Sequence, residues 1–157
     1  MLDIYKPIVE TSTISFELRV PSVDEFSARV KSYGESHAWI VAEKQGAVLG
    51  YAYGLPHRSR EAYRYSAETS VYVAPTSRGE GVGKRLYGDL FERLATGGYY
   101  QAFAGVTLPN EASEALHAAV GFQRIGTFPK VGFKFGEWCD VSWWSRSLRD
   151  DQPGGAS

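Results

Sequence analysis

Cysteine is nearly missing from this chain, since Cys139 is the only one in 157 residues. A single cysteine cannot form a disulfide within the chain, and by itself it cannot supply the ligands of a zinc site. We therefore expect no metal and a fold that needs no cross-links, which fits a protein of the reducing cytoplasm.

Long apolar runs and a surplus of positive charge are lacking too. No stretch approaches the roughly 20 apolar residues of a membrane span, and the first ten residues, MLDIYKPIVE, do not follow the order of a signal peptide. Lysine and arginine number 17 against 18 aspartate and glutamate residues. Because there is no surplus of positive charge to neutralise nucleic acid or an anionic membrane, we expect the chain to bind neither of them. A small-molecule partner is favoured.

The length fits one domain, which we place at 1–148 and expect to be followed by a flexible, glycine-rich tail at 149–157. Apolar periodicity and turn signals predict the order α, ββ, β, α, β, α, ββ. The expected helices cover 21–34, 81–97 and 110–121, after a short helical piece at 2–10. The expected strands form a hairpin at 38–54, single strands at 64–75 and 99–108, and a second hairpin at 131–148.

Glycine is concentrated where the third strand gives way to a helix, at Gly79, Gly81 and Gly83. Glycine permits positive φ and a close approach of the main chain to a ligand, and a helix start presents unpaired N–H groups with partial positive charge. Because Arg78 and Lys84 flank the three glycines, this pattern predicts a binding site for an anion.

Two familiar phosphate-binding patterns do not fit this loop. A P-loop would place a glycine where Arg78 stands and a hydroxyl residue where Arg85 stands. The dinucleotide fingerprint G-x-G-x-x-G fails as well, because Lys84 or Leu86 occupies the position of its third glycine. Neither a P-loop nucleotide site nor a dinucleotide site is therefore expected.

The stretch from Arg78 to Gly83 has the form R-x-x-G-x-G and directly follows the strand SVYV. It resembles the acetyl-CoA site of GNAT N-acetyltransferases. The resemblance implies an α/β (α+β) fold with a twisted, mixed, mostly antiparallel sheet flanked by helices, and a bulge in the strand before the loop whose free main-chain groups pair with pantetheine. The residues implied to bind acetyl-CoA are Val71, Tyr72, Val73, Arg78, Gly79, Glu80, Gly81, Val82, Gly83, Lys84 and Asn110.

Further segments resemble one branch of that family, the phosphinothricin and methionine sulfoximine acetyltransferases. They include ETSTISFE, REAYRYSAETSVYV, LPNEASEALHAAVGF and VGFKFGEWCDVSWW. The branch implies a homodimer that acetylates small amino acids. It also places a strand and most of a helix before the stretch matching LDIYKPIVE, so we expect a helix remnant, no strand before Ser12, and a bare edge on the strand at 38–44.

Two catalytic residues are implied by the resemblance. Glu68, three residues before Val71, is implied to be the general base or to hold a water molecule. His117 is seven residues after Asn110, almost two helical turns, so both side chains should share one face. A histidine there could accept the proton of the ammonium or return one to sulfur, and the sequence leaves both roles open.

The acceptor is expected to be a small, amino-acid-like amine whose carboxylate needs a cation with forked donors. Arg60 and Tyr63 match the family's positions for this task, and Phe16 and Glu17 lie on a loop that borders the pocket. Direct transfer in a ternary complex is expected. Two alternatives remain open, an enzyme acting on a peptide amine or polyamine and a non-catalytic sensor of acyl-CoA.

Overall fold

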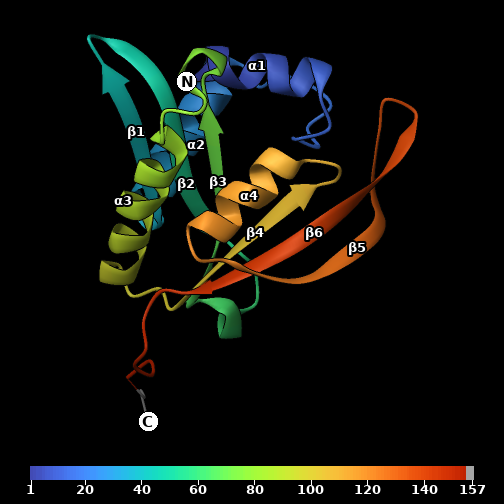
Figure 1. The fold of residues 1–157 in the computed structure, drawn as a ribbon. Coiled ribbons are helices and arrows are strands. Elements are labelled where there is room, and N and C mark those ends of the chain that lie inside the picture. The colour runs from blue at the N-terminus through green and yellow to red at the C-terminus, as the bar shows by residue number, and fades with distance from the viewer. Residues whose placement is uncertain (155–157) are drawn as a thin grey trace.

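The computed structural model describes residues 1–154, which form one six-stranded sheet with helices on both faces (Figure 1). The strands are arranged in the order β1-β2-β3-β4-β6-β5. The elements are α1 (Leu2–Thr11), α2 (Val23–Ser36), β1 (Ala38–Lys44), β2 (Ala47–Pro56), β3 (Ser66–Val73), α3 (Val82–Thr96), β4 (Gln101–Thr107), α4 (Glu111–Ala119), β5 (Gln123–Lys134) and β6 (Glu137–Ser147), with short 3-10 turns η1 (Glu61–Tyr63) and η2 (Pro75–Ser77).

The sheet is mixed and mostly antiparallel, which confirms the predicted fold class. Only β3 and β4 run parallel, and they are joined by three residue pairs, the last of which is Glu68 with Phe103. Beyond that pair the two strands separate, as the diverging arrows of β3 and β4 in Figure 1 show. The other neighbours, β1·β2, β2·β3, β4·β6 and β5·β6, are antiparallel.

Two apolar clusters hold the helices to opposite faces of the sheet. Successive strand residues point to opposite faces, so Tyr51 of β2 lies with α1 and α2, whereas its neighbour Ala52 lies with α3. The predicted period-four positions of α3, Leu86, Leu90 and Leu94, are all at most 2% exposed. Figure 1 shows α3 and α4 in front of the sheet and α2 behind it.

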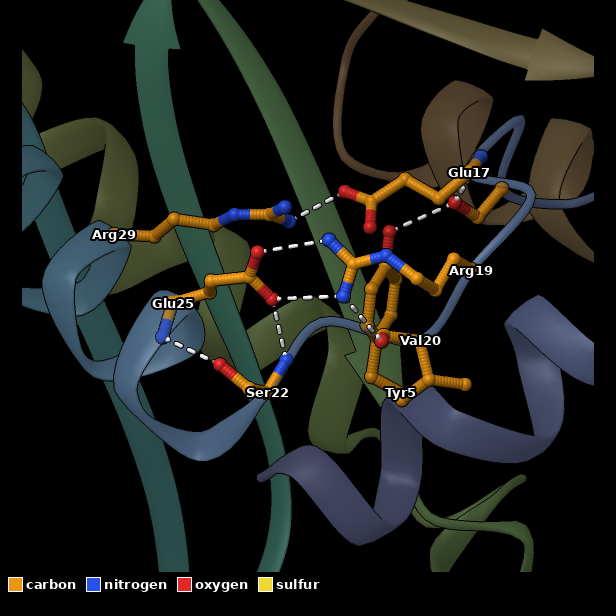
Figure 2. Close-up of polar contacts among 8 residues, drawn as sticks. Tyr5, Glu17, Arg19, Val20, Ser22, Glu25 and Arg29 are labelled. Carbon is orange, nitrogen blue, oxygen red and sulfur yellow. Dashed lines mark hydrogen bonds and ion pairs between the residues drawn. The ribbon is translucent and has the colours of Figure 1, made fainter.

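The start of α2 carries the capping box predicted by its sequence. The hydroxyl of Ser22 accepts a hydrogen bond from the main-chain N–H of Glu25, and the Glu25 carboxylate accepts one from the N–H of Ser22. Both terminal nitrogens of Arg19 donate hydrogen bonds to the same carboxylate (Figure 2), and this pairing lowers the pKa of Glu25 to about 2. The loop before α2 is therefore tied to the first turn of the helix.

The beginning of the chain agrees with the expected helix. α1 begins at Leu2 and contains Pro7, and no strand precedes Ser12. Within residues 1–154, β1 is an edge strand whose single strand neighbour is β2. Both hairpin turns contain the predicted glycine in the left-handed conformation, at Gly46 and Gly136.

Two further expectations concern the last third of the chain. β5 begins at Gln123, earlier than the expected 131, because the pairing of β5 with β6 continues past a register shift between Phe128 and Gly132. The flexible tail at 149–157 stays a prediction, and 155–157 lie outside the described residues. Among residues 1–154, no helix is both long and apolar enough to cross a membrane.

Replacing Ser22 with alanine should lower the free energy of unfolding by about 1 kcal/mol, because the main-chain N–H of Glu25 loses its acceptor. Urea unfolding followed by circular dichroism measures the change. Ser27→Ala is the matched control, since Ser27 is exposed in the middle of the same helix, and its stability should be equal or slightly higher. Equal losses in both variants would contradict the capping role.

Candidate active site

The separation of β3 from β4 leaves one edge of β3 open after Glu68. On its other edge β3 pairs with β2 without any register shift as far as Val73. The bulge implied by the family resemblance is therefore absent from β3, and that expectation is wrong. The main-chain groups of β3 are freed instead because β4 turns away from it. The result is equivalent chemically, since an extended ligand can pair with an open strand edge.

A cleft of about 620 Å³ lies beside this open edge, between β3, the start of α3 and α4. It includes every residue expected to bind acetyl-CoA except Glu80. The residues that line it from these elements are Val71, Tyr72, Val73, Ser77, Arg78, Gly79, Gly81, Val82, Gly83, Lys84, Asn110, Ala112, Ser113, Ala115, Leu116 and Ala119, with Ile8 and Ile14 at its border. Residues from distant parts of the chain are thus gathered around one cavity.

The loop at one end of the cleft has unpaired donors. Gly79 and Gly81 have φ angles of +80° and +75°, and a Cβ atom on either would meet no atom within 4 Å. Glycine is therefore required there by conformation rather than by crowding. Gly81 caps α3 without a side-chain bond, and the N–H groups of the next three residues, Val82 to Lys84, make no hydrogen bond within residues 1–154. Such a helix start attracts an anion.

Gly83 serves a different purpose from its two neighbours. It is buried, and a Cβ atom on it would lie 3.0 Å from Cδ2 of Leu116. The glycine thus lets α4 approach the first turn of α3, which closes one wall of the cleft. Glycine at position 83 therefore serves helix packing, in addition to the predicted contact with a ligand.

Asn110 and His117 do lie on one face of α4, but only Asn110 lines the large cleft. The side-chain oxygen of Asn110 accepts a hydrogen bond from the N–H of Ser113, as an N-cap does, which leaves its NH₂ group free to donate. The predicted double role, cap and ligand partner, is therefore chemically compatible.

His117 is buried, and both of its ring nitrogens have partners inside the protein. Nδ1 lies 2.7 Å from the carbonyl oxygen of Ser113, which can only accept, so Nδ1 carries the hydrogen. Nε2 lies 2.8 Å from the hydroxyl of Tyr87 and accepts from it. Burial lowers the pKa of His117, and the hydrogen bond to the Ser113 carbonyl opposes this effect. The ring is thus neutral, with its free lone pair directed at Tyr87.

Tyr87 connects His117 with the gap between the separating strands. Tyr87 and His117 both line a small cavity of about 50 Å³ between β3 and β4, together with Thr69 and Asn110. Burial raises the pKa of Tyr87, and the nearby hydroxyl of Thr69 opposes this effect. Sequence reasoning missed Tyr87, because its spacing in α3 marks it as one more core position.

Glu68 lies at the vertex where β3 and β4 part. Burial raises the pKa of its carboxyl group, opposed by the charge of Arg58. Nδ1 of His57 lies 3.6 Å from the Glu68 carboxylate, and its ring stacks on Phe103 at 4.4 Å between centroids. Burial, and then the charge of Arg58, lower the pKa of His57. The carboxylate therefore faces a neutral imidazole.

The four residues predicted to bind the acceptor are not equally placed. Tyr63 is 6.0 Å from the His57 ring, which puts it near Glu68. Arg60 is exposed at the start of η1, and its guanidinium makes no hydrogen bond or ion pair within residues 1–154. The arginine with an effect on Glu68 is Arg58, which also lies 5.9 Å over the ring of Trp143.

Phe16 and Glu17 lie on the loop between α1 and α2. The Glu17 carboxylate pairs with Arg29 of α2, as Figure 2 shows, within a cavity of about 310 Å³ that Tyr51 and Tyr53 also line. The ring of Phe16 rests against β5 and is 39% exposed.

The three tryptophans of β6 do not form one cluster. Trp144 is buried in the core and Trp138 is 61% exposed, whereas Trp143 faces His57 at 6.1 Å. Among residues 1–154, no three histidine, cysteine, aspartate or glutamate side chains gather closely enough to hold a metal ion.

Comparisons with known proteins agree with this geometry. The chain is 40% identical over 153 residues to the phosphinothricin N-acetyltransferase of Streptomyces coelicolor, covering 94% of this chain and 89% of that protein. It is 38% identical over 109 residues to the L-methionine sulfoximine/L-methionine sulfone acetyltransferase of Salmonella typhimurium, covering 69% and 64%. The solved phosphinothricin acetyltransferase of Sinorhizobium meliloti, in complex with AcCoA, superposes with a TM-score of 0.91 at 34% identity, covering 99% and 86%.

The family description that matches residues 6–122 is "Acetyltransferase (GNAT) family". That range contains the open edge of β3, the glycine loop, Glu68 and His117, so the match falls on the site as well as on the fold. The resemblance inferred from the sequence is confirmed, and this chain belongs to the GNAT acetyltransferase family.

Proposed function

We propose that this protein moves the acetyl group of acetyl-CoA to the amino group of a small amino acid or a close analogue such as phosphinothricin or methionine sulfoximine. The proposal rests on three features that lie in sequence along β3. Glu68 lies where β3 and β4 separate, the open strand edge follows it, and the glycine loop with its unpaired N–H groups lies beyond the end of the strand. Relatives named for these two substrates support the choice of acceptor.

The pyrophosphate and the pantetheine arm of acetyl-CoA each have a complementary part in the cleft. The pyrophosphate binds the free N–H groups from Val82 to Lys84, with Arg78 and Lys84 adding positive charge. Pantetheine extends along the open edge of Val71 to Val73, and the free NH₂ group of Asn110 donates to one of its carbonyls. Glu80 is the one predicted contact outside the lining of the cleft, and we retain it as a neighbour of the phosphates.

The chemistry is a direct transfer in a ternary complex. The neutral amine attacks the thioester carbonyl, a C–N bond forms, and the C–S bond breaks to release the thiolate of CoA. Glu68 accepts the proton lost by the amine, and its raised pKa makes it a stronger base than an ordinary glutamate. The thiolate takes up one proton from solvent and Glu68 returns its proton to solvent, so the amine loses one proton and CoA leaves as the thiol.

His117 acts on this reaction through Tyr87. Because its only hydrogen is bonded to the Ser113 carbonyl and burial disfavours the imidazolium, it is poorly prepared to protonate the thiolate itself. It fixes the hydroxyl of Tyr87, which lines the small cavity between β3 and β4 where the thioester arrives. His117 thus takes neither of the two roles left open by the sequence in our proposal, and instead accepts the hydrogen bond that orients Tyr87.

The acceptor lies on the face of the sheet that carries Glu68. Arg60 and Arg58 are near enough in the chain to share the acceptor's carboxylate, with Tyr63, Phe16 and Glu17 around the remainder of the molecule. We further propose a cytoplasmic homodimer, in which the apolar side chains exposed on β5 and on the β5–β6 turn are covered by the second copy. These side chains are Ile125, Phe128, Val131, Phe133 and Phe135.

The function is tested by thiol release from acetyl-CoA with phosphinothricin, methionine sulfoximine and a set of amino acids as acceptors. Release with at least one amino-acid-like acceptor is expected. Calorimetric titration with acetyl-CoA accompanies the assay. Binding without any release would support a sensor of acyl-CoA, release only with polyamines or peptides would support the other alternative, and the absence of binding would refute the site.

Glu68→Gln should slow turnover about a hundredfold or more while leaving the affinity for acetyl-CoA unchanged, because only proton transfer is lost. In the unaltered protein Glu68 must be ionised to act, so kcat/KM should rise with pH through the pKa of Glu68. Burial raises that pKa, so the rise should be centred above 4.5, the ordinary value. A rise that persists unchanged in Glu68→Gln would assign it to another group.

Tyr87→Phe and His117→Ala should lower kcat by similar factors, and the double variant should lose no more than either single one, since both changes remove the same oriented hydroxyl. Thermal unfolding of each variant separates this effect from loss of folded protein, because an unpaired buried partner costs about 1–3 kcal/mol. Losses of kcat that multiply in the double variant would show that His117 acts independently of Tyr87.

Gly81→Ala should weaken acetyl-CoA binding and lower stability by about 1 kcal/mol, because alanine resists the left-handed φ of +75°. Calorimetry and urea unfolding measure the two effects. Gly88→Ala, on the exposed side of the same helix with ordinary φ and open space around it, should instead stabilise the protein and leave affinity unchanged. If Gly81→Ala binds as tightly as Gly88→Ala, the loop is not the phosphate site.

A further inference from the structure

The loop between α1 and α2, residues 12–22, lies between the two halves of the site. Ile14 lines the cofactor cleft, and Glu17 lines the cavity beside Tyr51 and Tyr53. Phe16, proposed above to border the acceptor, lies with its ring against β5. A loop in this position can set the size of the acceptor pocket only if its own position is fixed.

One set of contacts comes from the helices on either side. The hydroxyl of Tyr5 in α1 lies 2.7 Å from the hydroxyl oxygen of Ser15, which also accepts a hydrogen bond from the main-chain N–H of Glu17. The side chain of Glu17 is in turn held by Arg29 of α2. These bonds fix Ser15 and Glu17 on either side of Phe16, but they make no contact with the Phe16 ring itself.

A second set comes from β5, more than a hundred residues later in the chain. Lys134 is 3% exposed, and its ammonium donates to two carbonyl oxygens, that of Val9 at 2.8 Å and that of Ser15 at 2.7 Å. Val9 is in the last turn of α1, where the helix dipole favours a cation. Burial lowers the pKa of Lys134, and the negative charge of Glu17 opposes this effect. The lysine thus joins the main chain of the loop to the sheet.

The same strand contacts the Phe16 ring at Gly132, two residues before Lys134. A Cβ atom on Gly132 would lie 2.9 Å from Cδ2 of Phe16 and closer still to Cε2 and Cζ. Gly132 does not have a positive φ, so its conformation does not require glycine. The missing side chain is required by the ring, which packs directly on the main chain of β5.

We propose that Gly132 and Lys134 of β5 together fix the position of the Phe16 ring, and that this position determines which acceptors the enzyme can bind. Lys134 is a positioning residue that holds the main chain at Ser15, and Gly132 determines how far the Phe16 ring stands from β5, and hence how much space is left for the side chain of the acceptor. This inference rests on the proposed function and adds two residues that do not touch the acceptor.

The decisive variant is Gly132→Ala. Its methyl group displaces the Phe16 ring, because Lys134 prevents the loop as a whole from moving away and Phe16, at 39% exposed, has room to turn aside. For the largest acceptor that the unaltered protein acetylates, kcat/KM should fall about tenfold relative to the smallest one, as expected for one methylene in a pocket. The affinity for acetyl-CoA should not change.

A double-mutant cycle with Phe16→Ala distinguishes the ring from other causes. In the Phe16→Ala background, Gly132→Ala has no ring to displace, so it should leave the ratio of kcat/KM values within twofold. Gly126→Ala is the matched control, because it adds the same methyl group to β5 where no atom lies within 4 Å. A change of acceptor preference that survives in the Phe16→Ala background, or that Gly126→Ala reproduces, would overturn the proposal.

Lys134 is tested separately with Lys134→Met and Lys134→Arg. Lys134→Met should raise KM for the acceptor at least about fivefold with a smaller change in kcat, and Lys134→Arg should recover part of it by donating to the same carbonyls. Equal KM values for all three proteins would refute the positioning role. Failure of the proposed function would be evident earlier, since the unaltered protein would then release no thiol with any acceptor.

Discussion

The site depends on one constraint, the short parallel pairing of β3 and β4. Three residue pairs hold the two strands together, and the sheet then opens at Glu68. Had the pairing continued, the main-chain groups from Thr69 to Val73 would have been used within the sheet, and neither the large cleft nor the small cavity would exist. Because β2 and β6 still pair with the outer edges of these strands, the opening is stable without being filled.

The glycine loop shows how one short motif can meet unrelated physical demands. Gly79 and Gly81 supply left-handed main-chain conformations in open space, and Gly83 supplies close helix packing against Leu116. A substitution at the first two sites therefore acts through main-chain conformation, and one at the third acts through the distance between α3 and α4. The motif was recognisable from the sequence because all three demands fall within five consecutive residues.

Much of the fold was predictable, because it follows from local patterns. The capping box of α2, the leucine spacing of α3 and the glycine turns of both hairpins each need only neighbouring residues. The cofactor cleft was predictable for the same reason, since most of its lining comes from one continuous strand, loop and helix. The expected bulge in β3 was wrong because the course of β4, not β3 itself, opens the edge.

The contacts that the sequence did not reveal join distant positions. Tyr87 and His117 are 30 residues apart, and Lys134 and Ser15 are 119 apart. Periodicity places each residue on a helix or strand face, but it does not say which residue of another element will lie opposite. His117 illustrates the limit, since its spacing from Asn110 placed it correctly on α4 while its partner remained unknown.

Burial has a common effect on the ionisable groups around the vertex, and that effect suits the transfer of a proton from an amine. It raises the pKa of Glu68 and lowers the pKa values of His57 and His117, so each group is pushed toward its neutral form. Neutral imidazoles do not stabilise the carboxylate by charge, which leaves Arg58 as the positive group opposing its protonation. A carboxylate held in this way has high proton affinity yet can still be ionised, and both properties are needed to accept a proton as the amine attacks.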